Sequence, residues 1–390
     1  MTFIYIFPGS IGMDKEKTNP DITKEEKSAE DIALILSNPP HIKGGQTIKS
    51  IMWLVVLALV PATVNSILIY GLKAAIVILT AVISAVLAEL VYQLIMKKPI
   101  AVGDGSAALT GLLLAMNIPP DAPFWVAGIG SIFSVIIVKQ LFGGLGYNIF
   151  NPALAGRAFL MASWPVYMTT KWHRFTDTNV LSEGVANIGR IPQNAFDAIT
   201  SATPLGALRE APKILSDLSA SPQSLYDLIF SPHMYKTLLW GNIGGCIGET
   251  SALLLLLGAL FLFYKRIITW HIPLSFIGTV AAFMLFYYSV KDVPGSNFIN
   301  YFTLKMSLFH VLSGGIILGA FFMATDMVTS PVTHRGMIIF GIGCGLITSV
   351  IRIWGGYPEG VSYSILLMNA VVPLIDRYTK PRVFGTSLID

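Results

Sequence analysis

The feature that most constrains this chain is a series of long apolar runs that recur along most of its length. An α-helix rises 1.5 Å per residue, so about 20 apolar residues cross the hydrocarbon core of a bilayer. Only 12% of the 390 residues are charged, about half the share that soluble domains carry. The chain is therefore expected to be an all-α polytopic membrane protein. Ten transmembrane segments are expected, at residues 49–70, 72–96, 106–118, 122–142, 149–163, 237–264, 268–290, 307–325, 336–354 and 361–376.

Two of these segments, 106–118 and 149–163, are shorter than a membrane span requires. Both are bordered by glycine or proline, in GDGSAALTG and NPALAG. Non-helical backbone at membrane depth is tolerated only where protein or a water-filled cavity surrounds it. We therefore expect short, broken helices that end inside the protein.

The two halves of the chain echo each other. Residues 139–160 (KQLFGGLGYNIFNPALAGRAFL) resemble residues 351–375, and residues 110–123 resemble residues 318–331. Each half holds five apolar segments, and an odd number gives the second repeat the opposite orientation to the first. Inverted repeats with interrupted helices are typical of transporter cores with a pathway near the midplane. The expected fold is therefore two inverted five-segment repeats.

Basic residues in alternate loops set the expected orientation, as at Lys97, Lys98, Lys265 and Arg266. Cytoplasmic loops are enriched in Lys and Arg, which puts both termini in the cytoplasm and the polar interlude outside. The opening residues lack the basic start of a secretory signal. The expected domains are a cytoplasmic N-terminal segment (1–48), a first repeat (49–163), an extracytoplasmic insert (164–236), a second repeat (237–376) and a cytoplasmic tail (377–390).

Three acidic residues stand at the edges of apolar segments: Asp104 in GDGS, Glu249 in GETS and Asp326 in ATDM. Charged groups at membrane depth are costly, and they indicate function by default. Carboxylates beside unwound backbone suit a small hard cation or a proton relay. The alternative is that they cap helices, because negative charge is favourable at a helix N-terminus. The sequence leaves both interpretations open, and the recurrence of three such sites favours an ion pathway.

The stretch GYNIFNPALAGR holds three polar residues that are candidates for binding a cofactor, Asn148, Asn151 and Arg157. Arg157 lies inside a short apolar segment, where a buried guanidinium needs an anionic partner. That partner is either a carboxylate or the phosphate of a cofactor, which arginine binds through its planar fork.

Cysteines and histidines point away from metal cofactors. Cys246 and Cys344 are the only two cysteines and have no C-x-x-C partner, so this chain does not supply the four thiolates of an iron–sulfur cluster. We expect both to pack as small apolar residues. The six histidines are scattered, which does not favour a haem held by two histidines. The net charge of +4 is small and gives no reason to expect nucleic-acid binding.

The polar interlude contains the stretch AFDAITSATPLGALRE, at residues 195–210. Thr203 followed by Pro204 is an ordinary helix start, with threonine as the N-cap and proline in the first turn. A helix N-terminus also binds phosphate well. A helix cap and a phosphate-bearing ligand at Thr203 are therefore compatible.

Several stretches together resemble one family of membrane proteins. They include SNPPHIKGGQTIKSIMWLVVLALVPA, GDGSAALTGLLLAMNIPP, FGGLGYNIFNPALAGRAF, DAITSATPL, GGCIGETSALLLLLGALFLFYKRIITWHIP, LSGGIILGAFFMATDMVTSP and LLMNAVVPLIDRYTKPRVFG. Over roughly residues 37–385, the chain resembles the family of D subunits of the Rnf electron-transport complex. The B subunit of the sodium-pumping NADH:quinone reductase is a more distant relative. The PPHI and PRVFG stretches favour the Rnf branch.

The resemblance implies a cofactor and its site. Thr203 matches the threonine that holds FMN through a phosphoester bond in this family, and Asp197 matches the acidic residue that opens the motif. Ser201 stands where glycine is usual. The same resemblance implies that Asp104, Glu249 and Asp326 match acidic positions associated with cation movement, and it implies a second, non-covalent flavin, riboflavin.

The expected function is that of a membrane component of an ion-translocating ferredoxin:NAD⁺ oxidoreductase in a prokaryotic cytoplasmic membrane. The resemblance implies electron transfer through covalent FMN, a path for Na⁺ or H⁺, and partners among the other Rnf proteins (A, B, C, E and G). This chain alone holds no complete active site. The alternatives are the B subunit of a sodium-pumping quinone reductase and a stand-alone channel or transporter of a small solute.

Overall fold

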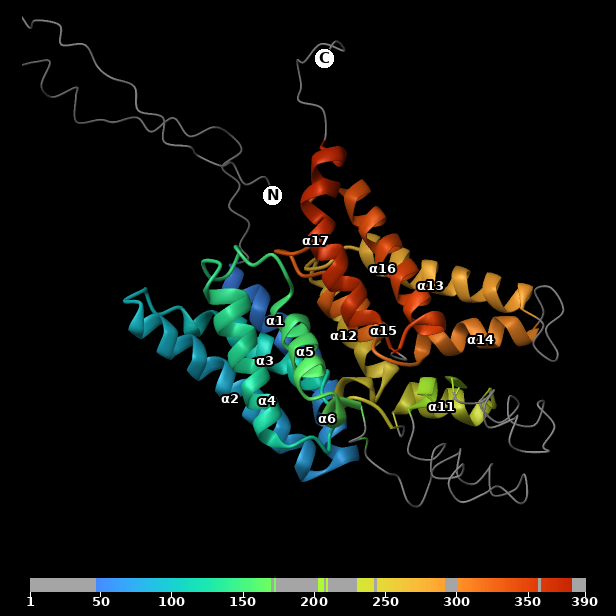
Figure 1. Cartoon of the computed structure of the whole chain (residues 1–390), viewed down its shortest axis with the longest axis horizontal. Coiled ribbons are helices and arrows are strands. Elements are labelled where there is room, and N and C mark those ends of the chain that lie inside the picture. Colours follow the sequence, from blue (N-terminus) through green and yellow to red (C-terminus); the bar gives the residue numbers. More distant parts are fainter. Residues whose placement is uncertain are drawn as a thin grey trace, which may run out of the picture. The chain divides into compact units, whose positions relative to one another are not determined.

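In the computed structural model of the chain, the described residues are 47–169, 172, 203–206, 208–209, 230–241, 244–291, 301–356 and 359–380. Every regular element that these residues form is a helix, as the sequence predicts. Figure 1 shows the helices of the first half gathered on the left and those of the second half on the right.

The helices follow one another with short connections. The first half contributes α1 (Ile48–Tyr70), α2 (Leu72–Ile95), η2 (Val102–Asp104), α3 (Ser106–Met116), α4 (Phe124–Phe133), η3 (Ser134–Gln140), α5 (Pro152–Ser163) and α6 (Pro165–Thr169). The second half contributes α11 (Pro232–Trp240), η4 (Ile247–Glu249), α12 (Ala252–Tyr264), α13 (His271–Val290), α14 (Tyr301–Leu312), α15 (Ile316–Leu318), η5 (Gly319–Met323), α16 (His334–Trp354) and α17 (Val361–Thr379). η2 and η4 are 3₁₀ turns, whereas η3 and η5 are π-helical turns that continue α4 and α15.

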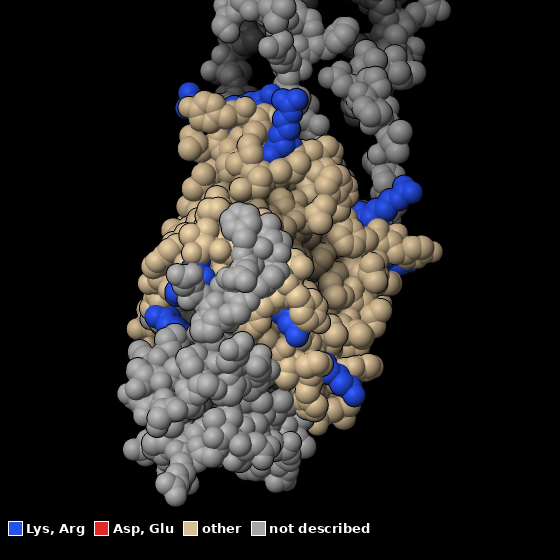
Figure 2. All heavy atoms as spheres, turned by 90° about the vertical axis from the view of Figure 1, so that its right-hand side faces the viewer, with Lys and Arg blue, Asp and Glu red and all other residues tan. Residues whose placement is uncertain are grey.

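Four helices are long and apolar enough to cross a membrane: α1, α2, α13 and α16. A fifth span results if α14 and the α15–η5 helix count as one, bent by 60°. Shorter apolar helices are α3, α4 with η3, and α12. Neutral side chains cover most of the face shown in Figure 2, and the charged side chains visible on it are Lys and Arg. The described residues therefore form a polytopic membrane protein.

The exposure pattern of α2 supports a lipid environment. Leu79, Ile83 and Leu87 are 59%, 54% and 52% exposed, whereas Ala81 and Ala85 are fully buried at 0%. Soluble proteins bury their large apolar side chains. Membrane helices pack against each other through small residues and leave the large ones to the lipid. The outward face of α2 is therefore an apolar surface that suits lipid or another membrane protein.

Close helix contacts at glycine hold the core together. A Cβ at Gly111 of α3 would lie 2.6 Å from the Ala81 carbonyl oxygen of α2, so these helices meet backbone to backbone. Gly258 of α12 packs just as tightly on the Ala58 carbonyl of α1. Because α1 and α12 come from different halves, this second contact joins the two halves.

The structure differs from the sequence prediction over residues 237–264, which were expected to form one segment. α11 ends at Gly241, whose φ of +108° few other residues adopt. A Cβ at Gly241 would also collide with the Thr250 carbonyl. The 3₁₀ turn η4 and then α12 follow. Tight backbone packing divides this segment into two helices. Such packing cannot be recognised from apolar composition.

Candidate functional site

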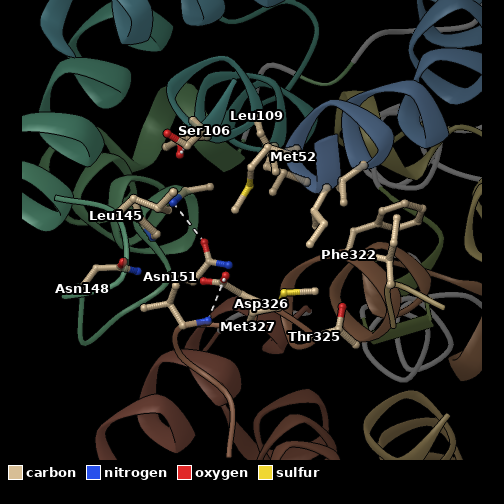
Figure 3. Close-up of a pocket in the computed structure, with 18 of the residues that line it drawn as sticks. Met52, Ser106, Leu109, Leu145, Asn148, Asn151, Phe322, Thr325, Asp326 and Met327 are labelled. Atoms are coloured by element: carbon tan, nitrogen blue, oxygen red, sulfur yellow. Dashed lines mark hydrogen bonds between the residues drawn. The ribbon is translucent and has the colours of Figure 1, made fainter. Parts of the chain in front are cut away.

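A pocket opens between the two halves of the helical core (Figure 3). Its walls include Met52 of α1, Ser106 and Leu109 of α3, the loop before α5, and the end of η5. Two asparagines predicted as cofactor ligands, Asn148 and Asn151, both line it. The structure therefore brings these two predicted residues to one cavity.

The two asparagines differ in how they are bound. Asn151 caps α5, because its side-chain oxygen accepts hydrogen bonds from Ala153 N at 3.1 Å and Leu154 N at 3.3 Å. Its amide nitrogen donates to the Met323 carbonyl at 3.2 Å. Asn148 donates to the Phe150 carbonyl at 3.1 Å, but its buried Oδ1 has no partner among the described residues. An unpaired buried acceptor on a pocket wall can accept a hydrogen bond from a water or from a ligand.

Asp326 belongs to the same pocket (Figure 3). Its carboxylate accepts hydrogen bonds from the Thr329 hydroxyl at 3.1 Å and from Val328 N at 3.4 Å. These contacts are those of an acidic residue that organises a local turn. The position on the pocket wall leaves Asp326 available for a cation or a ligand as well.

A buried ion pair lies behind the pocket. Lys139, at 1% exposure, lies 2.8 Å from a Glu89 carboxylate oxygen and 2.6 Å from the Ser106 hydroxyl. Gln140 donates to the same Glu89 oxygen at 2.6 Å. The Ser106 hydroxyl and amide in turn donate to Asp104, at 2.6 and 2.8 Å. We call these five residues the Lys139 cluster, in which Asp104 precedes the N-cap of α3, Gly105, and accepts from the first N–H of that helix.

Arg157 lies in a second cluster and does not line the pocket. Its guanidinium forms an ion pair with Glu359, and it donates to Asn117 Oδ1 at 2.8 Å and to the Ser362 hydroxyl at 3.0 Å. Of the two partners that the sequence left open, the structure shows a carboxylate. The sulfur of Cys246 is 3.8 Å from the same guanidinium, so this cysteine has a polar neighbour as well as a packing role.

Glu249 adjoins this second group. Ligand atoms of Cys246, Glu249 and Glu359 all lie within 4.8 Å of one another. Oε1 of Glu249 is buried and has no hydrogen-bond partner among the described residues. We refer to Asn117, Arg157, Cys246, Glu249, Glu359 and Ser362 as the Arg157 cluster. Most of them stand at ends of interrupted helices, where ion sites of transporters are commonly built.

The three acidic residues predicted for an ion pathway thus fall in different places. Asp104 belongs to the Lys139 cluster, Asp326 lines the pocket and Glu249 joins the Arg157 cluster. Glu359 was missed by the sequence interpretation. It is a single acidic residue before an apolar helix and beside Gly360, the same pattern that drew attention to Asp104 and Glu249.

The residues predicted to surround a covalent flavin are only partly described. Thr203 is 5% exposed, and its hydroxyl oxygen accepts a hydrogen bond from Gly206 N at 3.1 Å. This is the N-cap contact that the Thr-Pro pair predicts. We call residues 203–206 the Thr203 turn. Asp197 and Ser201 lie outside the described residues.

Known proteins resemble this chain along most of its length. A family model described as the NQR2, RnfD, RnfE family matches residues 35–385. The D subunit of the proton-translocating ferredoxin:NAD(+) oxidoreductase complex of Clostridium ljungdahlii is 45% identical over 351 residues, covering 90% of this chain and 96% of that protein.

Two further relatives agree. The D subunit of the Na(+)-translocating ferredoxin:NAD(+) oxidoreductase complex of Acetobacterium woodii is 46% identical over 360 residues, covering 92% of this chain and 98% of the relative. The D subunit of the ion-translocating oxidoreductase complex of Escherichia coli is 38% identical over 371 residues, covering 90% of this chain and 98% of that protein. The chain therefore belongs to the NQR2, RnfD, RnfE family.

Proposed function

We propose that this chain is the D subunit of an Rnf-type, ion-translocating ferredoxin:NAD⁺ oxidoreductase complex. The observation that carries the proposal is the 45–46% identity to two D subunits over at least 90% of the chain. One of these relatives is named for protons and the other for Na⁺. The proposed cargo is accordingly Na⁺ or H⁺, and electron donor and acceptor bind other subunits of the complex.

The proposed electron carrier is FMN, esterified through its phosphate to the hydroxyl of Thr203. In the described part of the chain, that oxygen accepts a single hydrogen bond, from Gly206 N. Ester formation would replace the O–H bond of Thr203 by an O–P bond and, written from FMN, would release one water, and it needs no change in the hydrogen bond from Gly206 N. Asp197 and Ser201 flank the site in the sequence. A flavin accepts one or two electrons and releases them singly, so it bridges one-electron carriers.

The second flavin, riboflavin, stays a proposal that rests on the family resemblance. The pocket beside Asn148 offers polar groups from Asn148, Asn151 and Lys139 on walls that are otherwise largely apolar. Its volume is about 80 Å³, whereas cofactor pockets have about 300–1,000 Å³. The pocket as described therefore does not fit a flavin, and no step is assigned to riboflavin.

The proposed ion pathway includes Asp104, Glu249 and Asp326, within ten transmembrane segments arranged as two inverted repeats. Support comes from α3 and α15, two short helices that each follow a glycine-containing break, at Gly105 and Gly314. The π-helical turns η3 and η5 add to it, because such turns are frequent at functional sites.

The proposed topology has cytoplasmic termini and an extracytoplasmic insert at 164–236, between repeats at 49–163 and 237–376. The flanking segments, 1–48 and 377–390, face the cytoplasm of a prokaryotic cell. The proposed partners are the other Rnf subunits. The B subunit of a quinone reductase, from the same family, is the alternative function, and it differs in the electron acceptor.

Flavin fluorescence of the denatured chain tests the proposal. The complex is expressed in a host that attaches flavins and run on a denaturing gel under ultraviolet light. We expect a fluorescent band for the native chain and for Thr203→Ser, which keeps the hydroxyl. Thr203→Asp keeps a good N-cap but offers no hydroxyl, so it should be dark. Ser216→Ala, outside the motif in the same insert, is the control and should remain fluorescent.

A dark native band would contradict the electron-carrier proposal. It would favour a stand-alone channel or transporter, which predicts a colourless protein that moves its solute in liposomes without partners. A fluorescent band for Thr203→Asp would show that the flavin is attached to another residue.

A further inference from the structure

The Thr203 turn packs against a break in the membrane helices. Leu205 is 5% exposed, and a Cβ added at Gly314 would lie 2.8 Å from its Cδ1 atom. Gly314 has a φ of +69° and lies between α14 and α15, where the helix axis bends by 60°. The turn that carries Thr203 therefore rests directly on this break.

Arg352 reaches the same break from α16. The same added Cβ at Gly314 would lie 2.9 Å from Nη2 of Arg352. That nitrogen donates to the Ser313 carbonyl at 3.0 Å, and Nη1 donates to the His310 carbonyl. His310 lies in the last turn of α14 and Ser313 directly follows that helix, where carbonyls lack partners within the helix. Arg352 and Leu205 thus fill the space on Gly314 together.

A third hydrogen bond connects Arg352 to the Arg157 cluster. Nε of Arg352 donates to the main-chain carbonyl of Glu359 at 3.2 Å, and the Glu359 carboxylate forms the ion pair with Arg157. A helix cap for α14 would account for the bonds to His310 and Ser313, but it gives no reason for the bond to Glu359. Arg352, at 6% exposure, therefore joins the end of α14 to the residue before α17.

We propose that Arg352 is a positioning residue that couples the Thr203 turn to the Arg157 cluster. This inference rests on the proposed function, because it takes the Thr203 turn as the flavin carrier and Glu249 with Glu359 as part of the ion pathway. Leu205 has no free space to move into at Gly314. A shift of Leu205 therefore displaces either the α14–α15 break or the guanidinium of Arg352. Either displacement moves the Glu359 backbone and the carboxylate that binds Arg157. Such a packed element has discrete arrangements that two sites can bias.

The test uses the whole complex in proteoliposomes. Reduced ferredoxin and NAD⁺ drive the reaction, and NADH formation is recorded together with uptake of ²²Na⁺ and the signal of a pH-sensitive dye. The quantity compared is the number of cations moved per electron. For Arg352→Gln, which loses the charge and the fork, we expect this ratio to fall at least about fivefold, the lower end of common coupling effects. NADH formation should continue close to the native rate.

Two further variants separate coupling from folding. Gly314→Ala inserts a methyl group between Leu205 and Arg352 and should lower the ratio as well. Gly71→Ala is its matched control, because Gly71 has a similar φ of +73° and no atom within 4 Å of an added Cβ. It should keep the native ratio. Arg352→Lys keeps the charge but lacks the planar fork, so it should resemble Arg352→Gln.

An unchanged ratio in Arg352→Gln and Gly314→Ala overturns the proposal, and so does an equal loss of both activities. If the Arg352→Gln complex fails to assemble, the proposal is tested by comparing the number of cations moved per electron in Gly314→Ala with that in Gly71→Ala. Fluorescence of each chain on a denaturing gel is recorded in parallel. A dark native chain contradicts the flavin at Thr203, whereas a fluorescent chain with an unchanged ratio contradicts only the role of Arg352.

Discussion

Lys139 and Arg352 occupy corresponding places in the two similar stretches 139–160 and 351–375, each a few residues before a Gly-Gly pair. Both side chains are buried, and both reach a helix break, Lys139 at Ser106, the first residue of α3, and Arg352 at Ser313, before α15. Their partners differ. Lys139 contacts the Glu89 carboxylate, whereas the described contacts of Arg352 are main-chain carbonyls.

We infer from this difference that the Lys139 cluster is fixed in place, whereas the region around Arg352 can respond to movement of its neighbours. A lysine paired directly with a carboxylate at 2.8 Å is neutralised where it stands, and moving it would leave two buried charges without compensation. Arg352 donates hydrogen bonds to three main-chain carbonyls, two at the end of α14 and one before α17. Its position therefore depends on where these two segments lie relative to each other. Lys139 thus fixes a helix break in the first half of the chain, whereas Arg352 links a break in the second half to the Arg157 cluster.

The largest expected effect comes from breaking the Lys139–Glu89 pair. Lys139→Met leaves the Glu89 carboxylate buried without its cation, which should lower the free energy of unfolding by about 3–5 kcal/mol. The thermal midpoint of the detergent-solubilised complex measures this. The double variant Lys139→Met, Glu89→Leu removes both charges and should recover most of the loss. A single variant as stable as the native protein would show that Lys139 does not lock the break.

A smaller effect should distinguish two carboxylates within the Arg157 cluster. Glu359→Gln weakens a charge-assisted bond to Arg157, which should lower the free energy of unfolding by about 1.5–3 kcal/mol. Glu249→Gln should lower the free energy of unfolding by only about 1 kcal/mol, because the described contacts of Glu249 are hydrogen bonds to Cys246 and Glu359 and not an ion pair. Both variants should reduce cation uptake in proteoliposomes. Equal destabilisation by the two would contradict the assigned pairing.

The smallest effect concerns Asp104, whose carboxylate accepts from the amide and hydroxyl of Ser106 at the start of α3, a contact that satisfies one N–H of the helix as a cap does. Asp104→Ala should lower the free energy of unfolding by about 1 kcal/mol, whereas Asp104→Asn still caps and should cost little. Cation uptake of Asp104→Asn separates the two interpretations of this residue. Native uptake means that Asp104 is a cap alone, and a strong decrease with native stability assigns it to the ion pathway.

The helices could be predicted well from the sequence, and their breaks less well. Each of the ten predicted apolar segments overlaps a helix. Such segments can be recognised from local sequence, because a membrane helix needs a continuous run of apolar residues. The division at Gly241 was not foreseen, since it depends on contact with the Thr250 carbonyl. Contacts between segments distant in the sequence leave no mark on local composition.

The pairing of charged residues was the least predictable part. One pocket gathers Asn148, Asn151 and Asp326, and that these residues meet a ligand stays a prediction. Arg157 was correctly expected to need an anion, but its partner, Glu359, is 202 positions away in the sequence. Which carboxylate meets which cation is decided by helix packing, so it required the structure.

The central claim is that this membrane protein carries FMN on Thr203. Mass spectrometry of the peptide that spans Thr203, isolated from the native complex, tests it most directly. The account predicts a peptide heavier by one FMN less one water, with fragment ions that place the addition on Thr203. An unmodified peptide from a host that attaches flavins, or an addition placed on another residue, would contradict it.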